Sequence, residues 1–245
     1  MGVAYPSTRS SISLALALTL LTAGVLTLTG AVTVVRVPET AAEVEGVIQL
    51  PAPSLTGEVS VEEAIASRRS IRSYADSPLT LQEFSQLLWA AQGITDPVRG
   101  FRSAPSAGAT YPLTVFAAVS EGGVLGLEPG IYEYLPELHG LRLVRRGDFS
   151  EELAEAALGQ AWVREAPVCL VIAADYSRTT RVYGERGVRY VHMEAGHVGE
   201  NIYLQATAMG LGTVAVGAFH DDEVAEILQA GLSPLYIFPV GRVAP

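Results

Sequence analysis

"GERGVRYVHMEAGHVGENIYLQATAMGLGTVAVGAF", residues 184–219, contains the longest helix that the sequence predicts and, after it, a short strand. The helix is expected over Val188–Met209, and the glycine that follows would end it, because glycine is the usual residue just past a helix C-terminus. The strand is expected over Val214–Val216, and Gly217 and Ala218 then leave the backbone open to a ligand. A helix that precedes its strand reverses the order of a dinucleotide-binding turn, so this stretch predicts no Rossmann domain.

Helices and strands alternate irregularly on both sides of this stretch, which predicts an α+β fold with one central mixed β-sheet flanked by helices. Further strands are expected at residues 115–119, 131–135, 141–144, 168–173 and 236–240, and further helices at 151–158 and 222–229. Two capping boxes, beginning at Ser60 and Thr80, each predict a helix start. The second helix carries its core face at i, i+3, i+4 and i+7, on Phe84, Leu87, Leu88 and Ala91.

The chain divides into three parts by composition. Residues 1–36 form an N-terminal membrane anchor or signal segment, because Ile12 to Val35 carries no charge and is long enough to cross ~30 Å of hydrocarbon. An uncleaved transmembrane helix is favoured, since the run exceeds the apolar core of about 7–15 residues found in cleavable signals. Residues 37–59 are interpreted as a linker, and residues 60–245 as the folded domain. The acidic residues after the anchor favour an extracytoplasmic domain, secreted if the segment is cleaved.

Composition excludes several classes of function. A net charge of −10 argues against a nucleic-acid partner. All 16 basic residues are arginine, so Schiff-base chemistry, a pyridoxal lysine and a Walker-type lysine are excluded. The single cysteine, Cys169, allows neither an internal disulfide nor a thiolate metal site. His192 and His197 are five residues apart and diverge on a helix, so no metal site is predicted there, although Glu194 lies between them.

Three arginines are concentrated in "SRRSIRSY", residues 67–74, of this acidic chain. If the first helix continues through this stretch, Arg68 and Arg72 share a face, and Ser70 lies near them. Together with Arg69 they would suit a phosphate dianion, because guanidinium groups bind phosphate oxygens in pairs. The alternative is a solvated basic face paired with the acidic neighbours Glu62, Glu63 and Asp76.

Two other segments could complete a site for a flat, phosphorylated heterocycle. The loop "RSAPSAGATYP", residues 102–112, combines small residues that admit a ligand close to the backbone, namely Pro105, Ser106, Ala107 and Gly108. Arg242, in the C-terminal "PVGRV", follows a strand and could reach the same anion. The sequence contains no G-x-S-x-G nucleophile elbow, so it does not predict a serine hydrolase of that kind.

The segments "RRSIRSY", "LLWAAQGI", "RSAPSAGATYPL", residues 184–219 and "PVGR" together resemble the SagB/ThcOx-type dehydrogenase branch of the nitroreductase-like FMN-dependent flavoenzymes. The resemblance extends from about Leu50 to Val243. It implies a nitroreductase-like fold, an obligate homodimer with two FMN molecules at its interface, and hydride transfer through the flavin to or from a small-molecule or peptide substrate. NAD(P)H is the candidate electron donor.

The resemblance also assigns roles to residues. It places Arg68, Ser70 and Arg242 at the FMN phosphate and Arg72 near the pyrimidine end of the ring. Arg69 matches the motif but has an ion pair as an alternative role. The segment from Pro105 through Ser106 and Ala107 to Gly108 would approach FMN from the partner subunit, and the backbone of Gly217 and Ala218 would face the flavin nitrogen that accepts hydride.

One departure from the family concerns catalysis. Azoline-oxidising relatives carry a lysine-tyrosine pair, whereas Val182-Tyr183 stands here. Tyr183 remains the candidate catalytic residue, with simple packing against the domain as the alternative. A guanidinium at Arg181 does not replace the lysine, because it keeps its proton at neutral pH. Three interpretations therefore stay open: a dehydrogenase, a nitro- or quinone-reducing enzyme, and a non-catalytic, membrane-tethered flavin-binding or interaction module.

Overall fold

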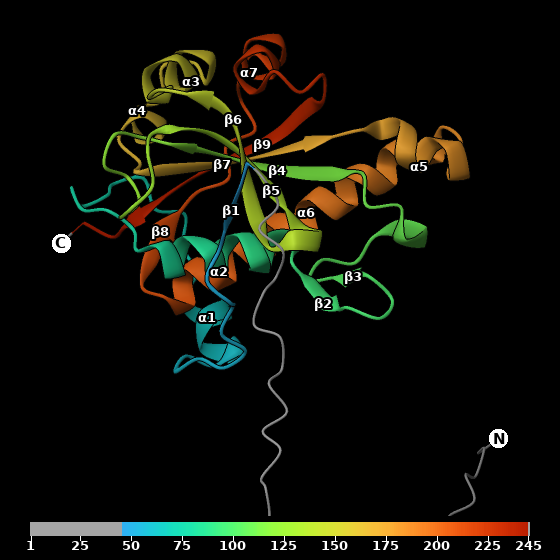
Figure 1. The fold of residues 1–245 in the computed structure, drawn as a ribbon, viewed down its shortest axis with the longest axis horizontal. Coiled ribbons are helices and arrows are strands. Elements are labelled where there is room, and N and C mark those ends of the chain that lie inside the picture. The colour runs from blue at the N-terminus through green and yellow to red at the C-terminus, as the bar shows by residue number, and fades with distance from the viewer. Residues whose placement is uncertain (1–45, 245) are drawn as a thin grey trace, which may run out of the picture. The chain divides into compact units, whose positions relative to one another are not determined.

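The computed structural model describes residues 46–244, and these form one seven-stranded antiparallel sheet with helices on both faces (Figure 1). The strand order across the sheet is β1-β6-β5-β4-β7-β9-β8. These strands are β1 (Val47–Gln49), β4 (Leu113–Val119), β5 (Gly130–Leu135), β6 (Gly140–Arg146), β7 (Val168–Ala174), β8 (Leu211–Thr213) and β9 (Ser233–Arg242). A separate two-stranded ladder joins β2 (Ile94–Asp96) to β3 (Phe101–Arg102).

The predicted mixed sheet is wrong, because every ladder of the sheet is antiparallel. The long helical connection after β7 does lead to a strand that runs in the same direction, β8. However, β9 lies between β7 and β8 and pairs with both in the antiparallel sense. The strand that comes last in the chain therefore separates the two strands that run in the same direction.

The central strands β4 and β7 are buried on both faces, so their sequences are apolar throughout, apart from Thr114 near the start of β4. Alternate residues point to opposite faces. In β7, Leu170 and Ile172 belong to one hydrophobic cluster, whereas Cys169 and Val171 belong to the other. The sheet thus separates two cores, and Cys169 fills space in one of them, where burial raises the pKa of its thiol.

Helices cover the two faces unequally (Figure 1). On one face α2 (Leu81–Gln92) packs against α6 (Arg186–Ala208), and α6 also carries α1 (Val61–Ser67) and α5 (Tyr176–Tyr183). The other face carries α3 (Ser150–Ala156), α4 (Ala161–Arg164) and α7 (Asp221–Leu228). Two short 3₁₀ turns, η1 (Ala107–Ala109) and η2 (Pro136–Leu138), complete the elements.

Both predicted capping boxes are confirmed. Ser60 and Glu63 exchange hydrogen bonds at the start of α1, as Thr80 and Glu83 do at the start of α2. The predicted core face of α2 is also confirmed, because its members Phe84, Leu87, Leu88 and Ala91 are fully buried. The capping side chains satisfy backbone N–H groups that a helix start otherwise leaves free.

The first helix does not continue through the arginine cluster. It ends at Ser67, and Arg68 already has an extended backbone, so Arg68 and Arg72 share no helical face. The competing interaction is with the sheet: the backbone N–H of Ile71 donates to the carbonyl of Thr213 (2.9 Å) at the free edge of β8. Gly212 permits this approach, since a Cβ there would lie 2.6 Å from a methyl group of Ile71.

The strand predicted at residues 214–216 is displaced. The ladder occupies Leu211–Thr213, and Val216 makes only an isolated bridge with Ile237. The other predicted strands and helices are confirmed within a few residues of their expected ends. The sequence could not fix the register, because the stretch 211–213 and the apolar run 214–216 both contain residues that favour a strand.

The predicted membrane segment, residues 12–35, lies outside the described residues and stays a prediction. Among residues 46–244, no helix has the length and apolar character needed to cross a membrane. Within the predicted linker 37–59, the structure finds β1, which pairs with β6 at the edge of the sheet. The part of that segment nearest the domain is therefore integrated into the fold.

Candidate functional site

Arg68 and Ser70 meet at one side chain of α6, Tyr203. The Arg68 guanidinium lies over the Tyr203 ring, 4.9 Å from its centroid, and Ser70 Oγ shares a hydrogen bond of 3.1 Å with Tyr203 Oη. The same oxygen accepts from the backbone N–H of Ala215 (2.7 Å), just beyond β8. Tyr203 thus fixes both predicted phosphate ligands against the edge of the sheet.

Arg242 lies at the end of β9, where its backbone pairs with Leu211 of β8. One of its terminal nitrogens donates to Glu83 Oε2 at 2.9 Å, and this oxygen is also the acceptor in the capping box of α2. The pair is partly exposed to solvent. Because arginine carries five N–H donors, the contact with Glu83 leaves others free to bind an anion.

None of the three clustered arginines forms an ion pair with a carboxylate of the described residues. Glu63, one expected partner, is engaged in its capping box instead. Arg69 donates to the backbone carbonyls of Ala66 and Arg68. Within the described residues, the clustered arginines therefore do not pair with acidic neighbours, which was the alternative interpretation of this segment. Arg68 remains available to an external anion.

Arg72 does not join the other two residues. Its guanidinium lies over the ring of Trp162 in α4, 5.5 Å from the centroid, and Trp162 packs against the core on the opposite side of the sheet from Tyr203. The arginine segment is held against β9 by Tyr74, which follows Arg72 by two residues. The Tyr74 hydroxyl donates to the carbonyls of Ile71 and Pro239. Burial raises the pKa of Tyr74, so this phenol stays a neutral donor.

Gly217 and Ala218 follow β8 and are exposed, as expected for a backbone that a ligand approaches. A Cβ built on Gly217 would make only an ordinary contact, 3.6 Å from the Tyr236 ring. The carbonyl of Ala218 accepts from the side-chain amide of Gln160 (2.9 Å), which holds this turn in place. The turn, Arg68 and Ser70 therefore all lie around the same edge of the sheet.

The loop with Pro105, Ser106, Ala107 and Gly108 lies elsewhere. It packs near Glu194 in the N-terminal half of α6, whereas Arg68 and Ser70 contact Tyr203 in the C-terminal half. At 1.5 Å per residue the two positions on α6 are about 14 Å apart along the helix axis. One chain therefore does not bring all of the predicted site residues together.

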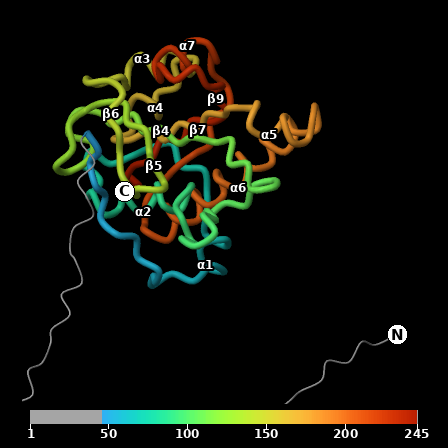
Figure 2. Tube along the Cα trace, turned by 45° about the vertical axis from the view of Figure 1, so that its right-hand side comes forward, coloured from blue at the N-terminus to red at the C-terminus, as the bar shows by residue number. Residues whose placement is uncertain are grey.

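Tyr183, the candidate catalytic residue, belongs to this second group. It is the last residue of α5, 37% exposed, and its ring packs edge-on against Tyr190 with the centroids 5.1 Å apart. A Cβ on Gly108 would lie 2.6 Å from the Tyr183 hydroxyl, so a side chain at this position would force Tyr183 to shift. In both views α5 projects from the edge of the domain, away from α1 (Figure 1, Figure 2).

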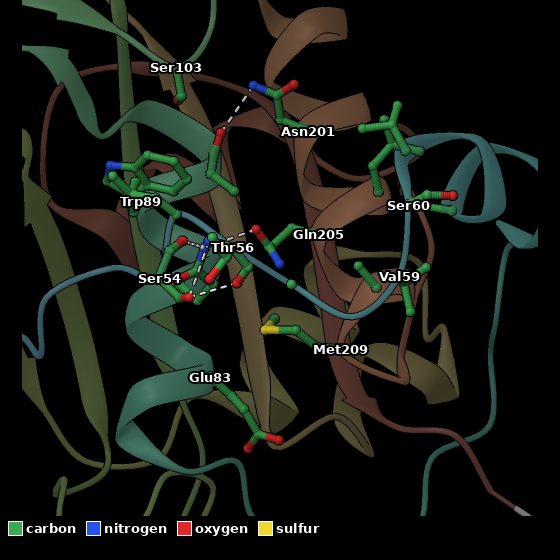
Figure 3. A pocket seen from close by; sticks show the side chains of 18 of the residues that line it. Ser54, Thr56, Val59, Ser60, Glu83, Trp89, Ser103, Asn201, Gln205 and Met209 are labelled. Atoms are coloured by element: carbon green, nitrogen blue, oxygen red, sulfur yellow. Dashed lines mark hydrogen bonds between the residues drawn. The ribbon is translucent and has the colours of Figure 1, made fainter.

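A cavity of about 510 Å³ lies between the segment before α1, α2 and α6 (Figure 3). Its wall contains Ser103, adjacent to the loop, and Glu83, the partner of Arg242. The wall combines apolar residues, including Trp89 and Met209, with a similar number of polar ones. Its volume lies within the ~300–1,000 Å³ typical of small-molecule sites.

Two polar lining residues of this cavity escaped the sequence analysis. The amide of Gln86, in α2, donates to the amide oxygen of Gln205, in α6, at 3.0 Å and also to the backbone carbonyl of Ser54. Gln86 is buried. A glutamine at a core-facing helix position was the signal, since buried polar groups are kept only where they find partners.

A buried acidic residue was also missed. Glu194 is 3% exposed on α6, and burial raises the pKa of its carboxyl, an effect only partly offset by the nearby side chains of Ser106 and Gln92 and the charges of Arg102 and Arg178. His192 points elsewhere and shares a hydrogen bond of 2.6 Å with the hydroxyl of Tyr176. Within residues 46–244 no three histidine, cysteine or acidic side chains are grouped as metal ligands.

The site fits a phosphorylated, flat ligand. A guanidinium without a carboxylate partner and a serine hydroxyl lie at one edge of the sheet, a second arginine is nearby, and the exposed turn at Gly217 offers backbone to an approaching ring.

Comparisons with known proteins agree with this picture. The sequence model described as "Nitroreductase family" matches residues 65–242. A Methanocaldococcus jannaschii protein named "putative nitroreductase" is 54% identical over 76% of this chain and 92% of its own length. The "FMN reductase [NAD(P)H]" of Bacillus subtilis is 26% identical over 74% of this chain and 62% of its own length. A crystal structure from Ralstonia eutropha, also titled "putative nitroreductase", superposes with a TM-score of 0.71 at 30% identity, covering 82% of this chain and 91% of that one.

Proposed function

Because this chain belongs to the nitroreductase family, we propose that it is an FMN-dependent oxidoreductase of the SagB type, which transfers hydride through bound flavin. The observation that carries the proposal is the assembly of Arg68 and Ser70 on Tyr203, beside an exposed turn at the sheet edge. This arrangement offers a phosphate site and a ring site next to each other.

The proposed flavin ligands follow from this arrangement. Arg68 and Ser70 hold the phosphate. Arg242 is a third ligand, which also donates a hydrogen bond to Glu83. The backbone at Gly217 and Ala218 lines the ring. Arg69, which bonds to backbone, shapes the segment rather than touching the cofactor. Bound FMN would supply the two-electron chemistry that no side chain of this chain can perform.

Arg72 is assigned to the pyrimidine end of the ring. A cation there would stabilise the negative charge that a reduced flavin carries. This role requires the Arg72 guanidinium to leave the Trp162 ring, which is an exchange of one weak contact for a charged one.

A homodimer completes the site in this proposal. The partner subunit's copy of the loop from Pro105 to Gly108 would close over the ring, as the resemblance to the SagB-type enzymes implies. Exposed apolar residues near α1 are available for such an interface, and they include Val61 (65% exposed) and Ile65 (58% exposed). Apolar surface of this kind is usually covered by a partner.

The substrate that we favour is a small acceptor such as a quinone or an aromatic nitro compound. The B. subtilis relative is named for NAD(P)H, and we propose the same donor here. Oxidation of peptide azolines is less favoured, since no lysine precedes Tyr183. We assign to Tyr183, whose hydroxyl lies beside Gly108, the role of donating a hydrogen bond to the substrate. A non-catalytic flavin-binding module is the alternative.

Anaerobic reduction tests the proposal. NADH or NADPH should bleach the flavin absorbance of the full-length protein, and a quinone or nitroaromatic should restore it through repeated cycles. Tyr183→Phe should keep its flavin but reoxidise more slowly, because it loses one donor. Flavin that is bound but never cycles, with any donor or acceptor, would favour the non-catalytic module.

A further inference from the structure

Three buried polar atoms without hydrogen-bond partners lie together at the base of the loop from Arg102 to Pro112. They are Nε2 of Gln92, Nε of Arg102 and Oε1 of Glu194. Gln92 and Arg102 are joined to each other by a hydrogen bond of 3.0 Å, and the side chains of both influence the carboxyl of Glu194. Buried polar groups left without partners are uncommon and tend to mark sites with a task other than stability.

Glu194 is the centre of this group. Its carboxyl is buried on the core side of α6, so ionisation would place a charge where water cannot solvate it. Arg102 from β3 and Arg178 from α5 are the charged groups near it, and Gln92 from α2 and Ser106 from the loop are the polar ones. The Arg102 charge is already shared with Glu137 through an ion pair of 2.8 Å.

Ser106 connects Glu194 with the reaction site. Its Oγ accepts from the backbone N–H of Tyr111 (2.9 Å), which leaves the hydroxyl proton free to be donated. Ser106 is half-buried, and in the proposed dimer its loop faces the flavin of the partner subunit. A hydroxyl in this position can take a proton from the carboxyl behind it and pass its own proton forward.

A second cavity is lined by three of the side chains that surround Glu194, and it offers a route for replacing the proton. A polar cavity of about 170 Å³ is lined by Gln92, Arg102, Arg178 and Glu137. This volume is large enough for water molecules. Protons could therefore reach Glu194 from solvent without passing through the substrate site.

We propose that Glu194 is a buried acid that supplies, through Ser106, the proton consumed when the substrate is reduced. The inference rests on the proposed function. Reduction of a quinone to a hydroquinone adds one hydride, which carries two electrons from the reduced cofactor, and one proton. The O–H bond of Ser106 breaks as the quinone oxygen is protonated, the O–H bond of Glu194 breaks to restore the serine, and water in the polar cavity reprotonates the carboxylate.

The same assignment predicts how stability depends on pH. Burial raises the pKa of Glu194 in the folded protein above the usual carboxyl range. The unfolded chain therefore releases this proton at a lower pH than the folded chain does. The unfolding free energy therefore falls as the pH rises from the pKa of an ordinary carboxyl to the raised pKa of Glu194, and it is lowest above that raised pKa. Glu194→Gln has no carboxyl at this position to titrate. The unfolding free energy of the variant should therefore fall less over that pH range than the unfolding free energy of the wild type.

The kinetic test compares two acceptors with the full-length flavoprotein. Benzoquinone needs a proton when it is reduced, whereas ferricyanide takes single electrons and needs none. Glu194→Gln should slow reoxidation by benzoquinone on the order of 100-fold, the usual contribution of a general acid, and leave reoxidation by ferricyanide unchanged. Ser106→Ala should slow reoxidation by benzoquinone by a similar factor, and the double variant should be no slower with benzoquinone than either single one.

Infrared spectroscopy supplies a readout that does not depend on turnover. At neutral pH the wild type should show the carbonyl band of a protonated carboxylic acid, and Glu194→Gln should lack it. Equal rates for wild type and Glu194→Gln with benzoquinone, an equal loss with both acceptors, or no acid band would overturn the inference while leaving the flavin assignment intact. Failure of the wild type to bind FMN would instead overturn the proposed function.

Discussion

Tyr203 has the central position among the individual residues of the site. A single phenol contacts the guanidinium of Arg68, the hydroxyl of Ser70 and the backbone beyond β8. The sequence analysis selected Arg68 and Ser70 from their residue types and spacing but did not select Tyr203. An aromatic residue in a long amphipathic helix looks like ordinary core, and its polar contacts come from segments far away in the chain.

Replacement of Arg68 by alanine should weaken FMN binding. A hydrogen bond to a charged group contributes about 1.5–3 kcal/mol, which corresponds to a loss of affinity of about 10- to 150-fold. Fluorescence titration of the apoprotein with FMN measures the change. Arg99→Ala is the matched control, since Arg99 is exposed and its contacts are an ion pair with Asp96 and the ring of Phe101. Equal affinities of Arg68→Ala and wild type would remove Arg68 from the site.

Residue-scale reasoning also had clear limits. The sequence identified Tyr183 and Gly108 separately, but only the structure shows that the hydroxyl of one occupies the space beside the other. Glu194 was considered only as a metal ligand, because its burial depends on the loop and the helix that pack around it. Chemistry that arises from burial cannot be obtained from spacing alone.

At the scale of elements, the sequence predicted helix starts correctly but did not predict how distant segments pair with the strands of the sheet. Capping boxes at Ser60 and Thr80 fixed two helix starts, because the bonds involved span only three residues. The end of α1 was mispredicted, since the edge of β8 captures Ile71 from outside the helix. The insertion of β9 between β7 and β8 likewise depends on contacts that no local pattern encodes.

Gly212→Ala tests whether the segment from Arg68 to Arg72 depends on the edge of β8. The new methyl group would lie 2.6 Å from a methyl of Ile71, so the protein should lose about 1–3 kcal/mol of unfolding free energy. The segment should move, and FMN affinity should fall with it. Chemical denaturation and FMN titration measure the two effects.

Gly217→Ala is the matched control for this prediction. Its methyl group would make only an ordinary contact with Tyr236, so the unfolding free energy should stay close to that of the wild type. A Gly212→Ala protein with wild-type stability and wild-type FMN affinity would show that the edge of β8 does not hold the arginine segment.

On the scale of the whole molecule, the two groups of site residues lie at different positions along α6. Arg68, Ser70, Arg242 and the turn at Gly217 lie toward its C-terminal half, whereas the loop around Gly108 and Tyr183 lie toward its N-terminal half. The sequence could list these residues, because their types suit one ligand. It could not show how far apart they lie in one folded chain, and we propose that they meet across the interface of a homodimer.

Co-expression of two differently mutated chains tests this claim most directly. One chain carries Arg68→Glu, and the other carries Gly108→Val, whose side chain would collide with Tyr183. In a heterodimer, one site contains both changes, and the other contains the intact Arg68 of one chain and the intact loop of its partner. Separate affinity tags allow this heterodimer to be isolated from the two parent homodimers.

The measurement is the ratio of bound FMN to chain, from the absorbance of the native protein and of the flavin released by denaturation. We predict wild-type dimers with both sites filled, homodimers of either variant nearly free of flavin, and heterodimers with one of their two sites filled. A folded wild-type dimer that stays colourless in excess FMN, or a heterodimer as empty as its parents, would contradict the account.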